Sequence, residues 1–127
     1  MGYRTLLILN AIITGLFGLG LIFAPEQMAA MNGFESSLAL VAANRQHGAA
    51  NIGLAVLSWL MRDLSNGPAR TGILASFLVG YGLSLLVSLF AQFGETANVA
   101  GWGGILVTFV LTAWFGWETF RSYRMEK

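Results

Sequence analysis

The chain has 127 residues, of which 56% are hydrophobic and 10% charged, and its mean hydropathy is +0.67. Soluble domains carry about 25% charged residues, so this composition excludes a water-facing globular domain. A net charge of +1 gives no basis for nucleic-acid binding, and the absence of cysteine excludes disulfides and thiolate metal sites.

Four apolar blocks indicate membrane spans, at residues 5–24, 38–61, 71–93 and 102–120. Each has about 20 residues or more, and at about 1.5 Å per residue this length crosses the roughly 30 Å of hydrocarbon in a bilayer. The connections are short, so we expect an all-α, up-down bundle of four transmembrane helices, with residues 1–127 forming one integral membrane domain. The first block is too long for the apolar core of a signal peptide, and we expect it to be retained.

The basic residues predict the orientation of these spans. On one side of the expected membrane lie Arg4, Arg62, Arg70, Arg121, Arg124 and Lys127, and on the other lies only Arg45. Cytoplasmic loops carry the excess of Lys and Arg in membrane proteins. Both termini and the 61–70 hairpin are therefore expected in the cytoplasm, and the 25–37 and 94–101 connections on the outside.

The first outer connection, PEQMAAMNGFESS, has the signals of a short helix. Pro25 suits a first helical turn, Glu26 favours the positive end of the helix dipole, and Gly33 can end the helix. Its apolar residues at helical spacing predict an interfacial position in the outer headgroup layer: Met28, Met31 and Phe34. Ser36 or Ser37 is expected to cap the next span.

Small residues recur every four positions in the last two blocks. The third block has Gly72, Ser76, Gly80, Ser84 and Ser88, and the fourth has Gly104, Thr108, Thr112 and Gly116. Such ridges let helices approach closely. They are interpreted either as contacts within one bundle or as a homo-oligomer contact or ligand groove. A similar row in the first block contains Asn10, Thr14 and Gly18.

The stretch NRQHGAAN, residues 44–51, interrupts the second block with polar side chains. Arg45 lies 17 residues before Arg62, or about 25 Å along a helix, so it and Gln46 can reach the outer headgroups. Asn51 lies about 16 Å from Arg62 by the same rise, near the midplane. At about 100° per residue, Asn51 shares one narrow stripe with Asn44 and Gly48.

This polar face predicts a candidate ligand pocket at the outer ends of the helices. Arg45 and His47 flank the stripe, and the predicted pocket is formed by Asn44, Arg45, His47, Gly48, Asn51 and Gln92, with Glu95 able to close it. A lipid phosphate or a quinone carbonyl would suit the basic and titratable side chains. The alternative is structural packing, in which the polar groups bond only to one another.

Other chemistry has little support in the sequence. One histidine and no cysteine cannot supply a strong metal or haem site within one chain, although a symmetric dimer could pair two copies of His47. Glu118 is the only carboxylate inside a block, and we expect it to pair with Arg121 at i+3 or with a nearby cytoplasmic arginine. The alternative role for Glu118 is a gate or proton site. No catalytic residues and no cofactor are predicted.

In the order of its features the chain resembles small four-helix bacterial membrane proteins of the DoxX-like and domain-of-unknown-function type. The likeness covers nearly the whole chain and consists of Phe23-Ala24-Pro25-Glu26, Met31-Asn32-Gly33-Phe34, the Arg-x-x-Gly of Arg45-Gln46-His47-Gly48, and the arginine-bearing hairpin. The resemblance implies a bacterial inner-membrane location and a bundle fold. Of the family's motif only Arg45 and Gly48 are carried over. Such families include accessory subunits of respiratory assemblies.

Three functions are compatible with these observations. The first is a non-catalytic accessory or scaffold subunit that docks to itself or to another membrane protein. The second is a lipid- or quinone-type ligand-binding membrane protein that uses the predicted outer pocket. The third is a small oligomeric channel or transporter. Membrane lipids are expected partners of all three.

Overall fold

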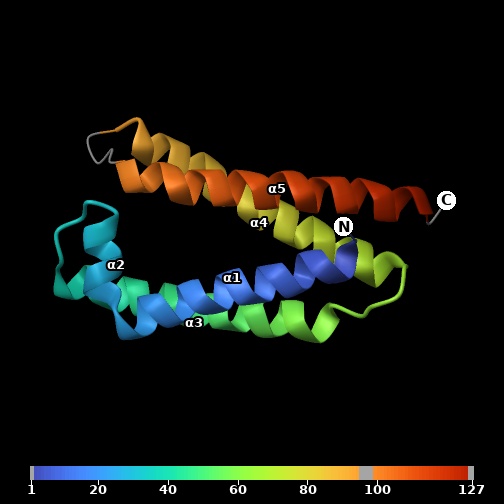
Figure 1. The fold of residues 1–127 in the computed structure, drawn as a ribbon, viewed down its shortest axis with the longest axis horizontal. Coiled ribbons are helices and arrows are strands. Elements are labelled where there is room, and N and C mark those ends of the chain that lie inside the picture. The colour runs from blue at the N-terminus through green and yellow to red at the C-terminus, as the bar shows by residue number, and fades with distance from the viewer. Residues whose placement is uncertain (1, 95–98, 126–127) are drawn as a thin grey trace. The chain divides into compact units, whose positions relative to one another are not determined.

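The computed structural model describes residues 2–94 and 99–125, and in these residues it contains five α-helices and no strand. The helices are α1 (Tyr3–Phe23), α2 (Pro25–Met31), α3 (Leu38–Met61), α4 (Pro68–Gln92) and α5 (Val99–Met125) (Figure 1). The all-α prediction is therefore confirmed. Glu95 and Lys127, which the sequence placed near the predicted pocket and among the basic ends, lie outside the described residues.

Among the described helices, α1, α4 and α5 are long and apolar enough to cross a membrane. The apolar block at residues 38–61 predicts a fourth span at α3, which has 24 residues but is not one of these three. The reason lies in residues 44–51, whose polar side chains lower the hydropathy of its first half. Three spans are thus supported by length and composition.

The short connection after α1 folds largely as its residues predict. Pro25 occupies the first turn of α2, and the helix ends at Met31. The next residue, Asn32, is its C-cap, and the Asn32 Nδ2 donates to the carbonyl of Met28 at 2.8 Å. Gly33 follows with a φ of 77°, a conformation in which a Cβ would be strained. The Ser37 Oγ accepts a hydrogen bond from the Leu40 N–H at 3.1 Å, so Ser37 is the cap of α3.

The chain divides into two compact units. The first, called here the α4–α5 unit, comprises Met1–Leu6 and Asp63–Lys127, so the first residues of α1 belong to it. The second, called the α1–α3 unit, comprises Leu7–Arg62 and contains most of α1 with α2 and α3.

In the α4–α5 unit the two long helices pack through stacked aromatic side chains. The Phe115 ring lies between Phe77 and Tyr81, with ring centroids 5.0 Å and 5.5 Å away. Phe115 and Leu74 are fully buried. Aromatic rings bury much area and stack favourably at these distances, so they form the core of the unit.

In the α1–α3 unit the two helices approach through small residues. A Cβ added to Gly48 would lie 2.7 Å from the Gly18 carbonyl oxygen and 2.9 Å from Ile22 Cγ1. A Cβ added to Gly15 would lie 3.6 Å from Ala55 Cβ. Because later residues of α1 meet earlier residues of α3, the helices are antiparallel neighbours, and glycine lets their backbones come close.

Polar side chains also join α1 to α3. The Asn10 Nδ2 donates to the Ser58 Oγ at 2.8 Å, and both side chains are fully buried. Ser58 Oγ–H donates in turn to the Leu54 carbonyl, and Thr14 Oγ1–H donates to the Asn10 carbonyl. The row Asn10, Thr14 and Gly18 is therefore part of the buried face of α1.

We predict that Gly48→Ala lowers the free energy of unfolding by about 1–3 kcal/mol, because its methyl group overlaps the Gly18 backbone. Thermal unfolding of the purified protein in detergent micelles measures this. Gly53→Ala on the same helix is the matched control, since no atom lies within 4 Å of its added Cβ, and alanine is the better helix former. Equal stability of the two variants would contradict the close approach.

Candidate functional site

The polar stripe of α3 is the buried face of that helix. Gly48, Asn51, Ala55 and Ser58 are its buried residues, as the spacing of about 100° per residue predicts. The Asn44 Nδ2 donates to the Pro25 carbonyl at 3.1 Å, and the Asn51 Nδ2 donates to the His47 carbonyl at 2.9 Å. The space beside Gly48 is occupied by the backbone of α1. These three residues therefore have structural contacts within the α1–α3 unit.

The charged and titratable residues of the same stretch lie at the surface of the α1–α3 unit. Arg45, Gln46 and His47 are exposed, and the His47 ring meets the edge of Phe17 at 6.3 Å between centroids. Gln92, which the sequence assigned to the same pocket, is buried at the end of α4 in the other unit. The structure thus brings Asn44, Gly48 and Asn51 together on one face, flanked by exposed Arg45 and His47.

The small-residue ridges of α4 and α5 are largely exposed. A Cβ added to Gly72, Gly80 or Gly104 meets no atom within 4 Å, whereas one at Gly116 would contact Leu78 at 3.5 Å. Ser76 and Ser84 are exposed, and Ser88, Thr108 and Thr112 are half-buried. The hydroxyls of Ser76, Thr108 and Thr112 donate to carbonyls four residues earlier in their own helices.

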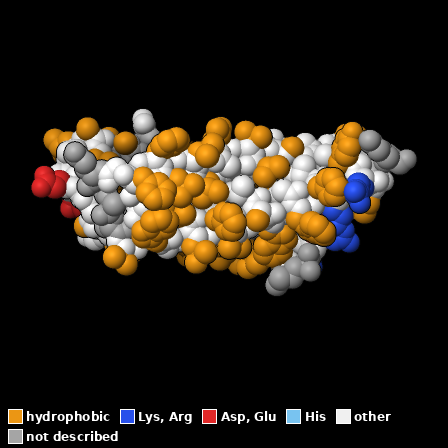
Figure 2. Space-filling view, turned by 90° about the horizontal axis from the view of Figure 1, so that it is seen from above, with side chains coloured by type: hydrophobic (Ala, Val, Ile, Leu, Met, Phe, Trp, Pro, Cys, Tyr) orange, Lys and Arg blue, Asp and Glu red, His pale blue; other side chains and the backbone are white. Residues whose placement is uncertain are grey.

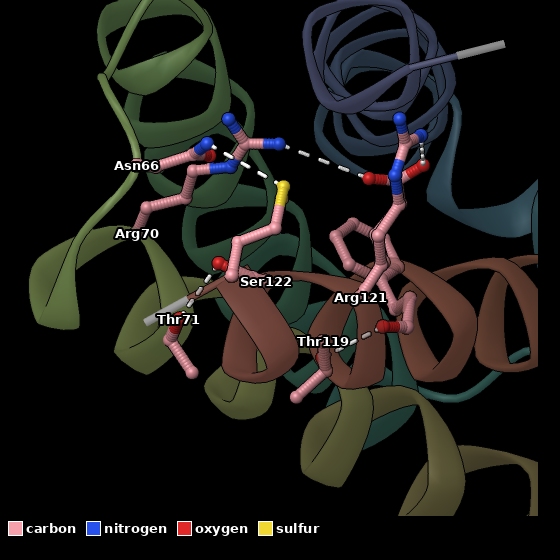
Figure 3. A network of polar contacts seen from close by, with 9 residues as sticks. Asn66, Arg70, Thr71, Thr119, Arg121 and Ser122 are labelled. Carbon is pink, nitrogen blue, oxygen red and sulfur yellow. Dashed lines mark hydrogen bonds and ion pairs between the residues drawn. The ribbon is translucent and has the colours of Figure 1, made fainter. Parts of the chain in front are cut away.

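The strongest concentration of buried charge in the described residues lies around Glu118 on α5. Its side chain is 1% exposed and lies between two guanidinium groups. Arg70 Nη2 and Arg121 Nη1 are each 3.8 Å from a carboxylate oxygen of Glu118. The predicted pairing of Glu118 with Arg121, or with another arginine, is confirmed with both partners. Figure 3 shows Arg70 and Arg121 in this network.

Helical spacing places these groups together. Phe115, Glu118 and Ser122 follow one another at three- and four-residue intervals on the buried face of α5, and Arg70 lies in the first turn of α4, which Pro68 begins. Ser122 Oγ and Thr71 Oγ1 share a hydrogen bond of 2.7 Å, so two hydroxyls join α4 to α5 one turn from the carboxylate (Figure 3).

The first residues of α1 complete this cluster within the α4–α5 unit. The Arg70 guanidinium lies 3.9 Å above the Tyr3 ring, and Arg4 Nε is 2.6 Å from Asp63 Oδ1. A guanidinium over an aromatic face is a favourable contact. We call Tyr3, Arg70, Thr71, Glu118, Arg121 and Ser122 the Glu118 cluster.

Three members of this cluster were not predicted from the sequence: Tyr3, Thr71 and Ser122. A signal was present for Ser122, which follows Glu118 by one helical turn, because polar residues four positions apart in an apolar helix share a face. Tyr3 and Thr71 lie on other helices, and spacing along α5 gives no signal for them.

The Glu118 cluster contains more positive than negative charge. Two guanidinium groups surround one carboxylate, and the N–O distances of 3.8 Å exceed the roughly 2.7–2.9 Å of a charge-assisted hydrogen bond. Among the described residues no group of three His, Cys, Asp or Glu side chains could hold a metal ion. The arrangement can hold charge inside an apolar helix pair and tie α4 to α5.

We predict that Arg70→Met destabilises the protein by about 3–5 kcal/mol, because it leaves the buried Glu118 with only an exposed partner. Arg121→Met is the matched control. Its side chain is 55% exposed, so its loss should change stability by about 0–1 kcal/mol. Replacing both Arg70 and Glu118 by Met should recover most of the loss. Denaturant unfolding in micelles compares the variants, and equal effects of the two single changes would refute this asymmetry.

No family model, curated protein or solved structure matches the chain. Its function is therefore inferred from the exposed ridges, the buried stripe of α3 and the Glu118 cluster.

Proposed function

We propose that the chain is a four-span protein of the bacterial inner membrane that acts as a non-catalytic accessory or scaffold subunit, docking to itself or to another membrane protein. This is the first of the three functions that the sequence favours. Its support comes from the apolar surface, the way α3 accommodates its polar residues, and the ridge of α4 that α5 does not cover.

The apolar surface supports insertion in lipid. Hydrophobic side chains are spread over the face shown in Figure 2, and large ones on the candidate spans are strongly exposed. Examples are Leu16 at 66%, Val87 at 68% and Phe90 at 81%. Lipid would cover such groups, whereas water would leave them exposed at a cost of about 25 cal/mol per Å².

The polar residues of α3 are compatible with a fourth span. The helix has 24 residues, or about 36 Å at 1.5 Å per residue. Asn51, in its middle, bonds to its own helix, and Ser58 bonds to Asn10. In lipid each polar group has to be satisfied by the protein, and these side chains meet that requirement. Arg45, nearer the N-terminal end of α3, is exposed and can reach headgroups by extending its side chain.

The observation that carries the docking proposal is the ridge of α4. Gly72, Ser76 and Gly80 are exposed and no atom lies within 4 Å of a Cβ built on either glycine. The same helix packs on α5 through Phe77 and Tyr81 instead. A flat ridge that the helix does not use for this contact favours close approach of another transmembrane helix.

The other two functions have less support in these contacts. A lipid- or quinone-type site would rest on Arg45 and His47 alone, because Asn44, Gly48 and Asn51 already have contacts in the α1–α3 unit. A channel or transporter would use Glu118, whose two arginine partners hold it in an ion-paired cluster.

The four-span topology predicts opposite sides for the two connections that flank α3. The chain has no cysteine, so single cysteines report position directly, and Ser36 and Ser65 are both exposed. In intact cells a membrane-impermeant thiol reagent should label Ser36→Cys, and should label Ser65→Cys only after permeabilisation. Labelling of both from outside at the same rate would show that α3 does not cross.

The docking proposal predicts that the wild-type protein in native membranes belongs to an assembly larger than its 13.7 kDa monomer, and that Gly80→Leu reduces it to the monomer. Leucine at this position would hold an approaching helix away. Gly103→Leu is the control, because Gly103 is also exposed and has open space but lies outside both ridges. Native mass spectrometry from membrane extracts measures the assembly. A wild-type monomer without partner would refute the proposal.

A further inference from the structure

The buried carboxylate of Glu118 lacks hydrogen bonds. Among the described residues neither Oε1 nor Oε2 has a hydrogen-bond partner, although the side chain is 1% exposed. An ionised carboxylate can accept at about four lone-pair positions. Its nearest guanidinium nitrogens lie 3.8 Å away on both sides, so they contribute charge without forming hydrogen bonds.

A buried donor in the same cluster is also without a partner. The Nε of Arg70 is buried and has no hydrogen bond in the described residues, while Nη2 of that side chain faces Glu118. Leaving such groups unsatisfied in an apolar surrounding is strongly unfavourable. Acceptors on α5 and a donor on α4 are thus unsatisfied in one network.

The chemistry of these groups limits what can satisfy them. The occupant has to donate to a carboxylate and accept from a guanidinium, which excludes apolar molecules. Glu118, Arg70 and Arg121 together carry a formal charge of +1, which disfavours a cation, and a simple anion has no proton to donate to the carboxylate. A small neutral molecule with both a donor and an acceptor remains. Water is such a molecule, and it can bridge two polar groups that lie more than about 3.5 Å apart.

We propose that Glu118 and Arg70 form a binding site for water inside the α4–α5 helix pair. Water donates to Glu118 and accepts from Arg70, and buried waters typically make about three hydrogen bonds to such groups. The Thr71 and Ser122 hydroxyls, bonded to each other at 2.7 Å, provide further polar atoms one turn away. Arg121, on the other side of the carboxylate, is 55% exposed. This site is independent of the docking ridge on α4.

Water-edited solid-state NMR tests the proposal on the full chain in phosphatidylcholine vesicles, whose headgroups have no N–H or O–H donor. The protein carries ¹³C in Glu, Phe and Ser and ¹⁵N in Arg. Of the described glutamates, Glu118 alone has a guanidinium within 4 Å, so dipolar contact with ¹⁵N identifies its Cδ without a variant. Magnetisation from water should reach this carbon about as fast as it reaches the exposed Glu26 side chain, and much faster than it reaches the buried Phe115 ring. Transfer as slow as that to Phe115 would overturn the proposal.

Two variants establish that the cluster itself holds the water. In the double variant Glu118→Met and Arg70→Met, fast transfer to Ser122 Cβ should be lost, and in Arg121→Met it should persist. Unchanged transfer to Ser122 in the double variant would also overturn the proposal. The Phe115 shifts report whether the aromatic stack is intact, and if the double variant does not fold, the wild-type comparison of Glu118 with Phe115 decides.

Discussion

Polar groups that lie inside apolar helices need partners from the chain itself, and this constraint organises both units. An amide or hydroxyl buried without a hydrogen bond costs several kcal/mol where water is excluded. The α1–α3 unit meets the constraint with neutral groups, as in the bond between Asn10 and Ser58. The α4–α5 unit meets it only in part, because the arginines on both sides of Glu118 supply charge but leave its carboxylate without a hydrogen bond from the described residues.

The two units use different means to bring their helices together. Glycine at positions 18 and 48 allows the backbones of α1 and α3 to touch, so their contact depends on the absence of side chains. The contact between α4 and α5 depends on large side chains instead, with Phe115 stacked between Phe77 and Tyr81. Close backbone contact and aromatic stacking are both effective where hydrophobic burial alone does not favour association.

Features that depend on neighbouring residues could be predicted from the sequence. Four such features follow from spacings of one to four residues along the chain: a cap of α3 at Ser36 or Ser37, the start of α2 at Pro25, the stripe of α3, and the pair between Glu118 and Arg121. The helix ends were harder to place, because α5 continues through charged residues to Met125, beyond the apolar block that ends at residue 120.

Features that join distant segments could not be predicted in the same way. The contact between Tyr3 and Arg70, the hydrogen bond between Thr71 and Ser122, and the aromatic stack depend on how each helix is rotated about its axis. Hydropathy gives only a broad indication of that rotation when a helix is apolar on every side. For the same reason the sequence located the α4 ridge and left open whether α5 covers it.

The close contact at Gly48 changes what a shared Arg-x-x-Gly pattern signifies. Any two helices that cross at this distance exclude a side chain at the crossing point, whatever the protein binds. Unrelated chains can therefore converge on that glycine for steric reasons. Within this pattern, the residue that can differ in its chemistry between such proteins is the arginine, here Arg45, which is exposed on the same helix.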